Sequence, residues 1–388
     1  MSGSRAKPLT ALALLLATIL AVVLLCSREP ESPGERLKID DASMAVADSG
    51  AWPIDGLSKV PPEEPDDYLG LLFNGLPTDG CEEIEQVAPA KTSRWDRHAN
   101  MVELSEQLSR SDDPDLLLAS ALLRPDPMDR WKLLDRVLVT NPGDPVALWQ
   151  KLQYCDQMDC DRQAIEAAAT AFDESNGMVW LEIAGDRIRA GQWHEAEAAM
   201  RRAVTAPRFD TYVINYAVLI ERGLAATTER GYIERYIYGV GVAAAMAVPS
   251  FADITRACAS DENNALTWID LCDDLGEQIT RVGRSQAVFY LGVGVRRTAA
   301  KRAGDTKQFD LLSHDANQRI SDLMRTQANA GAQVLAMNDP AVMQDYVENY
   351  LAHGEFDAME MLVDDARRLR NDPEYDQCNF VSRTDLGL

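Results

Sequence analysis

The sequence predicts an all-α protein built from antiparallel helix pairs. Three Asp-Pro pairs have the composition of helix starts: Asp113-Pro114, Asp144-Pro145 and Asp339-Pro340. An aspartate can cap the first turn, and a proline at the first helical position loses no hydrogen bond. Apolar residues recur at helical spacing between such signals, and no β-branched run alternates over the length of a strand. From Trp95 onward we therefore expect helices of roughly ten to twenty residues joined by short polar turns.

The amino-terminal end predicts a single transmembrane helix. Residues 1–8 form a short basic segment, and Leu9–Cys26 follows without a charge or a proline. Its 18 residues, at 1.5 Å each, give about 27 Å, close to the thickness of the hydrocarbon core. A cleavable signal would end in small residues, and Leu25 stands before Cys26 where a lipoprotein signal has a small residue. We therefore favour an uncleaved anchor over removal or lipidation.

Residues 27–85 predict a disordered linker, because they are rich in proline and charge and show no helical period. A flexible coil of about 60 residues would span roughly 43 Å on average. The whole chain has a formal net charge of −24. Such a charge repels nucleic acids and anionic lipid surfaces, so no nucleic-acid partner is expected.

The stretch Trp180–Ala203 has the clearest internal pattern. One group of residues recurs at helical spacing, Gly191 and Gln192 interrupt it, and a second group follows. The first group is Trp180, Ile183, Ala184 and Arg187, and the second is Trp193, Ala196, Met200 and Ala203, with Pro207 beyond. This order resembles the tetratricopeptide repeat. Ala184 stands where that family usually has Gly, and Arg187 stands where it usually has Tyr.

Two further segments repeat this order. Asn141–Pro145 leads into Trp149, which precedes Trp180 by 31 residues. Asp339–Leu369 repeats the sequence of helix, turn glycine and aromatic residue. The resemblance implies antiparallel helix pairs that form a partial right-handed solenoid. We therefore divide the helical part into a repeat region, residues 86–209, an irregular middle region, residues 210–335, and a final repeat with a tail, residues 336–388.

The middle region shows a second sign of duplication. Tyr238–Val242 is echoed by Leu291–Val295, with the glycines 53 positions apart. A dinucleotide-binding loop would need a third glycine and a preceding strand, and neither is present. We therefore interpret these glycines as places where two helices cross closely.

Six of the seven cysteines lie outside the membrane run, and their spacing favours disulfides in an oxidising compartment. The simplest pairing is Cys155–Cys160, Cys258–Cys272 and Cys81–Cys378. The alternatives are metal binding, which lacks the spacing of zinc sites, and six unrelated core thiols. Because basic residues on the two sides of the membrane run nearly balance, the cysteines decide the orientation. We expect a single-pass protein of a bacterial-type inner membrane with its bulk in the periplasm.

No pattern of catalytic residues is present. The four histidines are scattered, none pairs at the spacing of a metal-binding helix, and no nucleophile elbow or phosphate loop occurs. Glu174-Ser175 resembles the acid of helical cell-wall transglycosylases, but nothing around it matches that family. We therefore expect no catalytic residue, no cofactor and no metal.

The tetratricopeptide resemblance implies a peptide groove lined by the first helix of each pair. The positions that would line it are Gln150 and Tyr154 beside Trp149, and Leu181, Ile188 and Arg189 beside Trp180. Apolar surface, an amide, a phenol and a cation together suit an extended or helical peptide. The alternative is that another segment of the same chain fills this groove.

These observations lead us to expect a non-enzymatic, membrane-anchored periplasmic protein that binds protein or peptide partners. Two other classes remain open. An enzyme on an all-α scaffold, acting for example on cell-wall material, would have a pocket with converging acids or histidines. A structural or assembly subunit would have a large exposed apolar patch.

Overall fold

The structure is a computed structural model that describes residues 97–246, 251–260, 266–324 and 327–380. These residues belong to one compact unit, Pro77–Leu388, so the three helical regions form a single body. The predicted anchor, residues 9–26, and the predicted linker, residues 27–85, lie outside the described residues. None of the helices that the structure describes is both long and apolar enough to cross a membrane.

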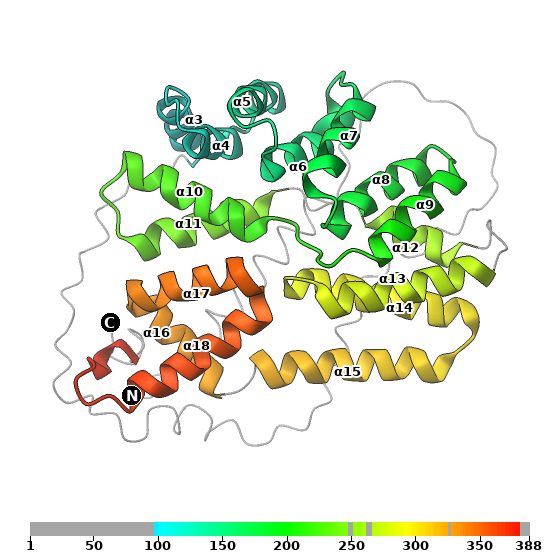
Figure 1. Cartoon of the computed structure of the whole chain (residues 1–388). Coiled ribbons are helices and arrows are strands. Elements are labelled where there is room, and N and C mark those ends of the chain that lie inside the picture. Colours follow the sequence, from blue (N-terminus) through cyan, green and yellow to red (C-terminus); the bar gives the residue numbers. More distant parts are fainter. Residues whose placement is uncertain (1–96, 247–250, 261–265, 325–326, 381–388) are drawn as a thin grey trace, which may run out of the picture. The chain divides into compact units, whose positions relative to one another are not determined.

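The described residues are helical and contain no β-strand, which confirms the all-α part of the predicted fold class (Figure 1). The helices are α3 (Arg97–Leu108), α4 (Pro114–Leu123), α5 (Pro127–Thr140), α6 (Pro145–Tyr154), η2 (Cys155–Gln157), α7 (Arg162–Asp173), α8 (Gly177–Arg189), α9 (Trp193–Val204), α10 (Val213–Thr227), α11 (Tyr232–Ala245), α12 (Ala252–Ala259), α13 (Leu266–Val282), α14 (Gln286–Ala303), α15 (Thr306–Met324), α16 (Gln327–Asn338), α17 (Pro340–His353), α18 (Glu355–Arg370) and η3 (Gln377–Phe380).

All three predicted Asp-Pro helix starts are present. The Asp144 carboxylate accepts a hydrogen bond from the Ala147 N–H at 2.8 Å, and Asp113 and Asp339 cap α4 and α17 in the same way. A fourth start of this kind, Asp126-Pro127, begins α5 and was missed although the dipeptide is the same. Among the described residues, four of the five Asp-Pro pairs start a helix, and the fifth, Asp372-Pro373, lies in a turn.

The first part of the fold is a succession of helix pairs. Helices α4 and α5, α6 and α7, and α8 and α9 pack as pairs, and each pair contacts the next. The turn between α8 and α9 is made by Gly191, whose φ of 70° is costly for any residue with a side chain. Ala184, Ala196 and Ala203 are fully buried, as the small residues of the sequence pattern predict.

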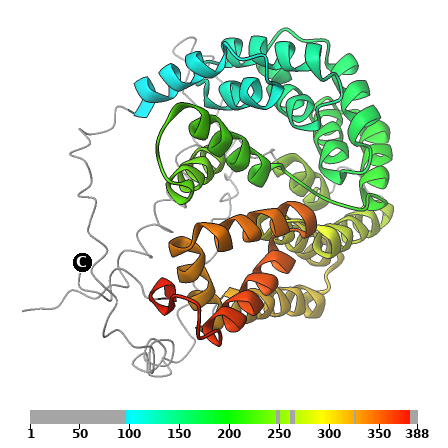
Figure 2. The same cartoon turned by 60° about the vertical axis from the view of Figure 1, so that its left-hand side comes forward.

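Two later helices then cover the first helices of these pairs. Helix α10 packs on α3 and α4, and α12 packs on α8 (Figures 1 and 2). Tyr212, just before α10, packs on Trp149 with their ring centroids 6.3 Å apart. The chain thus folds back after α9 and lays a second layer of helices over its own repeat region.

Four turns lie next to one another and are joined by hydrogen bonds; we call them the turn row. It comprises Asn176-Gly177, Arg208–Asp210, Val282–Arg284 and Gly354-Glu355. The Gly177 N–H donates to the Arg208 carbonyl at 2.8 Å, and the Arg284 N–H donates to the Phe209 carbonyl at 3.0 Å. The Glu355 N–H in turn donates to the Arg284 carbonyl at 2.8 Å. The turn row therefore links α8, α10, α14 and α18, which are far apart in the sequence.

Asn176 is the most heavily bonded side chain in the turn row. Its amide nitrogen donates to the Asp210 carbonyl at 2.9 Å, and its amide oxygen accepts from the N–H groups of Asp210 and Met178 at 3.0 and 3.1 Å. The side chain is fully buried. It thus satisfies both backbone groups of Asp210 as a neighbouring strand would.

Two of the echoed glycines, Gly239 and Gly292, lie where helices cross, whereas a Cβ atom on Gly241 would meet nothing within 4 Å. A Cβ atom on Gly239 of α11 would overlap the Ala217 carbonyl of α10. On Gly292 of α14 it would lie 2.8 Å from the Gly276 carbonyl of α13. Gly223 and Gly276 are also 53 positions apart, but a Cβ atom on Gly223 would meet Leu108 and Ala119, whereas one on Gly276 would meet α14.

Two of the predicted cysteine pairings are present. Cys155 and Cys160 are bonded across η2, with their Cα atoms 5.6 Å apart, and Cys258 of α12 is bonded to Cys272 of α13, with Cα atoms 5.9 Å apart. Both separations fall in the usual range for a disulfide. The third predicted pairing joins Cys378 to Cys81, which lies outside the described residues.

We predict that Asn176→Ala lowers the free energy of unfolding by about 3 kcal/mol, because it leaves the buried backbone groups of Asp210 without partners. Urea unfolding followed by circular dichroism would measure this loss. Asn141→Ala is the matched control, since its amide makes a surface contact with Asp144, and it should change stability by less than about 0.5 kcal/mol. Equal effects of the two variants would show that the turn row does not stabilise the fold.

We predict that replacing Cys258 and Cys272 together by alanine lowers the free energy of unfolding by about 3 kcal/mol. The reason is that the bond closes a loop and so restricts the unfolded chain. The same change at Cys155 and Cys160 should cost about 2 kcal/mol, because that loop is shorter. Unfolding with and without reductant measures both effects. Mass mapping of non-reduced digests checks the pairings, and free thiols at all four positions would contradict them.

Candidate functional site

Two of the five predicted groove positions, Leu181 and Gln150, do not lie on an open surface, and the prediction is wrong for these two. Leu181 is 2 % exposed and Gln150 is 1 % exposed, so both belong to the core. Tyr154 and Ile188 are half-buried, and Arg189 alone is exposed. The reason is that the second layer of helices lies on the face that the resemblance assigned to a peptide.

The contacts identify what fills the groove. The Gln150 amide donates to the Tyr216 hydroxyl of α10 at 2.7 Å, and the Arg189 guanidinium donates to the Asp253 carboxylate of α12 at 2.8 Å. The Tyr154 hydroxyl accepts a hydrogen bond from Arg130. Gln150 and Arg189 therefore contact other segments of the same chain, as the alternative interpretation expects.

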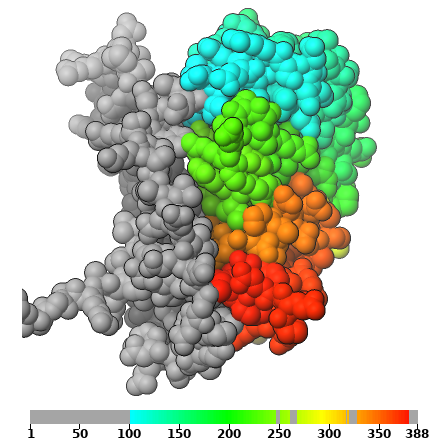
Figure 3. Space-filling model, turned by 90° about the vertical axis from the view of Figure 1, so that its left-hand side faces the viewer, coloured from blue at the N-terminus to red at the C-terminus, as the bar shows by residue number. Residues whose placement is uncertain are grey.

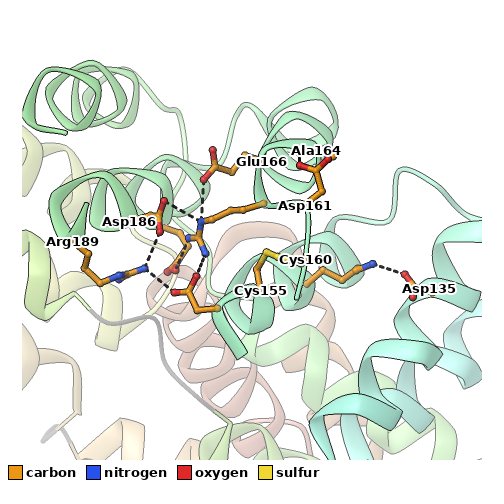
Figure 4. Close-up of a disulfide and its surroundings, with 12 residues drawn as sticks. Asp135, Cys155, Cys160, Asp161, Ala164, Glu166, Asp186 and Arg189 are labelled. Atoms are coloured by element: carbon orange, nitrogen blue, oxygen red, sulfur yellow. Dashed lines mark hydrogen bonds and ion pairs between the residues drawn. A yellow bond between two sulfur atoms is a disulfide. The ribbon is translucent and has the colours of Figure 1, made fainter. Parts of the chain in front are cut away.

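A network of charged side chains surrounds the Cys155–Cys160 disulfide (Figure 4). Arg162 contacts Asp156 at 2.6 Å and both Glu166 and Asp186 at 3.2 Å. Arg189 reaches Asp156 at 3.2 Å and Asp186 at 3.5 Å. These carboxylates are engaged by guanidinium groups from neighbouring helices. The network therefore joins η2, α7 and α8 and presents no free acid–base pair.

A cavity of about 390 Å³ opens at the end of the α8–α9 pair; we call it the Trp180 pocket. It is lined by Glu174, Ser175, Trp180, Arg202, Thr205, Ala206 and Pro207. These residues come from the α7–α8 turn, the start of α8, the end of α9 and the connection to α10. The pocket thus lies beside the turn row.

The polar groups of the Trp180 pocket hold the indole in place. Its Nε1–H donates to the Glu174 carbonyl at 3.0 Å, and the Arg202 guanidinium lies 6.0 Å from the ring centroid. The Arg202 and Glu174 side chains are 3.9 Å apart and remain 66 % and 71 % exposed. The pocket therefore offers an aromatic surface flanked by a cation, an anion and the hydroxyl residues Ser175 and Thr205.

The pocket lining holds few groups that titrate near neutral pH. Glu174 is the one acidic residue in the pocket lining, and no histidine lines it. The Glu174 carboxylate lies 3.9 Å from the Arg202 guanidinium and has no second acid beside it in the lining. General acid–base work normally needs a base and its partner at hydrogen-bond distance. Among the described residues no cluster of histidine, cysteine or acid side chains has the arrangement of a metal site.

No protein-family model, curated protein or solved structure matches this chain.

We predict that Leu181→Ala lowers the free energy of unfolding by about 3 kcal/mol, because it opens a cavity in the core. Ile188→Ala, at a half-buried groove position on the same helix, should cost about 1 kcal/mol. Thermal and urea unfolding of the two variants would measure the difference. A loss of stability below about 0.5 kcal/mol for Leu181→Ala would contradict its place in the core and would favour an open groove at this position.

Proposed function

We propose that the protein is a non-enzymatic, membrane-anchored helical-repeat protein of the tetratricopeptide type that binds a protein or peptide partner at the Trp180 pocket. The observation that supports this most directly is the pocket itself, which combines an indole with an exposed cation and anion. Trp180 is also the aromatic residue that begins the repeat pattern. The partner-binding surface is then the edge formed by the turns, and the inner face is closed by α10 and α12.

The size and chemistry of the pocket favour a peptide segment. A volume of about 390 Å³ lies at the small end of ligand sites and admits one or two side chains. An indole with proline beside it binds apolar or ring-shaped side chains, while Arg202 and Glu174 can each pair with a peptide's charged or amide groups. Tryptophan and arginine are the residues that most often dominate the energy of protein interfaces.

The proposed location is the periplasmic side of a bacterial-type inner membrane. The support comes from the two disulfides, because bonded cysteine pairs persist in oxidising compartments. In this proposal residues 9–26 anchor the chain, and residues 27–85 tether the helical unit to the membrane. The tether would let the Trp180 pocket sample partners within reach of the membrane surface.

The two competing classes have less support. An enzyme would need converging acids or histidines, and the Trp180 pocket has one acid facing an arginine. An assembly subunit would need one large apolar patch. The exposed large apolar side chains within the described residues are instead distributed over α5, α7, α11, α15, α16 and α18. We therefore favour partner binding.

A photo-crosslinking amino acid placed at Thr205 tests the proposal in intact membranes. We predict a discrete crosslinked partner, and we predict that Trp180→Ala reduces its yield about tenfold, because a central aromatic contact commonly contributes 2 kcal/mol or more. The same amino acid at Lys132, exposed on α5, is the control position and should give no such product.

Circular dichroism of Trp180→Ala must match the parent protein, so that a lost crosslink reports binding rather than unfolding. Equal crosslinking from Thr205 and Lys132, or a yield unaffected by Trp180→Ala, would refute the assignment of the pocket. Release of soluble fragments from cell-wall material by the purified protein would favour the enzyme class instead.

A further inference from the structure

A second candidate site lies at the far end of the turn row, around Glu355. The Glu355 carboxylate accepts a hydrogen bond from the Gln286 N–H at 2.7 Å and lies 3.4 Å from the Tyr350 hydroxyl. Burial raises the pKa of this carboxyl. Its backbone N–H is held by the Arg284 carbonyl, so the turn row fixes its position. Glu355 is thus an immobilised acid in a largely desolvated setting.

Two pairs of tyrosines lie on neighbouring helices near this acid. Tyr232 and Tyr236 of α11 stack with ring centroids 6.2 Å apart, and Tyr346 and Tyr350 of α17 pack edge to face at the same distance. Helices α11 and α17 contact each other (Figures 1 and 3). Burial is the largest cause that raises the pKa of Tyr346 and of Tyr350, and the charge of Glu355 is the second largest. The charge of Glu355 also raises the pKa of Tyr236. We call Glu355, Tyr236, Tyr346 and Tyr350 the tyrosine–Glu355 cluster.

The cluster is reachable from solvent. Glu355, Tyr346 and Tyr350 are partly exposed, whereas Tyr236 is buried behind them. Tyr232 extends the aromatic surface outward and is also partly exposed, and burial raises its pKa to about 12. One edge of the cluster therefore lies at the surface.

The acid has no cation to balance it among the described residues. The nearest guanidinium group along the turn row, that of Arg284, is committed elsewhere. It donates to the Leu351 carbonyl at 2.6 Å and to the Tyr350 carbonyl at 3.1 Å, and it lies 3.6 Å from Asp210. Glu355 therefore differs from Asp253 and Glu166, which are paired with arginines.

We propose that the tyrosine–Glu355 cluster binds an organic cation: a quaternary ammonium group or the basic side chain of a peptide. The negative faces of tyrosine rings attract cations, and sites for quaternary ammonium ligands are commonly walled by several aromatic rings. A carboxylate beside the rings adds a direct charge pair in a setting that weakly screens it. This site is separate from the Trp180 pocket and does not depend on the function proposed there.

A bare metal ion fits the cluster less well. Calcium needs six to eight oxygen ligands and magnesium needs near-octahedral geometry, whereas this cluster supplies one carboxylate and neutral phenols. A neutral apolar ligand would gain from the rings and nothing from the acid. The combination of rings and one uncompensated acid is what selects a cation.

Saturation-transfer NMR on the full-length, disulfide-bonded protein in detergent tests the proposal with choline as the probe. The matched control ligand is 3,3-dimethyl-1-butanol, which has the same shape and no charge. We predict transfer to the choline methyl groups and little to the alcohol. Nα-acetyl-lysine methylamide forms a second arm, and stronger binding of this probe than of choline would assign the site to a peptide side chain.

Two variants locate the binding. Glu355→Gln should lower the affinity for choline about tenfold, and Tyr346→Leu should lower it because one ring is lost. Glu360→Gln is the control, since it removes one exposed negative charge from α18, the helix that begins with Glu355. Equal transfer to choline and to the alcohol would overturn the proposal. So would choline binding that is unchanged in both Glu355→Gln and Tyr346→Leu.

Stability provides an independent readout, because Glu355→Gln should not unfold the protein. The titratable and charged groups around Glu355 are Tyr236, Tyr346, Tyr350 and Arg284. A folded-state pKa raised above the unfolded value means that the folded state holds more protons, so this group's contribution to stability falls as pH rises above about 4.5. Glu355→Gln is therefore expected to melt at a higher temperature than the parent near pH 8 and at the same temperature near pH 4. A variant that binds choline poorly yet melts higher would separate ligand binding from folding.

Discussion

The fold depends on the hydrogen bonds between Asn176 and Asp210. Those bonds fix the connection between α9 and α10, which is where the chain stops adding helix pairs outward and turns back over them. Phe209, next to Asp210, is fully buried, and its ring fits only because residue 177 is glycine: a Cβ atom there would overlap the ring. Tyr212 then takes a left-handed conformation, φ 61°, to start α10. The turn at Arg284 bonds to Phe209, and the turn at Glu355 bonds to Arg284.

Local structure could be predicted from the sequence, because its causes are local. Asp144 and Pro145 determine a helix start between them, and Gly191 determines a tight turn through its own φ. Cys155 and Cys160 are close enough in the chain that a short turn brings them together. The filled groove was not predictable in the same way. Gln150 meets Tyr216 across 66 positions, and Arg189 meets Asp253 across 64, so no window of sequence contains either contact.

The candidate sites likewise combine residues that are recognisable in the sequence with contacts that only the fold creates. Trp180, Glu174-Ser175 and Pro207 each stood out in the sequence, but only the packing of α8 on α9 and the connection to α10 brings them into one pocket. The tyrosine–Glu355 cluster was missed altogether. Its available signal was two tyrosine pairs at i and i+4, Tyr232 with Tyr236 and Tyr346 with Tyr350, which place both rings of a pair on one helix face. That spacing is common in helix cores, so the buried acid was needed to distinguish it.

The two described disulfides each join a cysteine to the next cysteine along the chain. Each bond therefore closes a short loop, with 5 and 14 positions between the paired cysteines, and restricts the unfolded chain only locally. Cys81 precedes both pairs in the chain, so it can compete with Cys160 for Cys155 until that bond has formed. Thiol–disulfide exchange would then be needed to convert a Cys81–Cys155 bond into the pair that the fold holds.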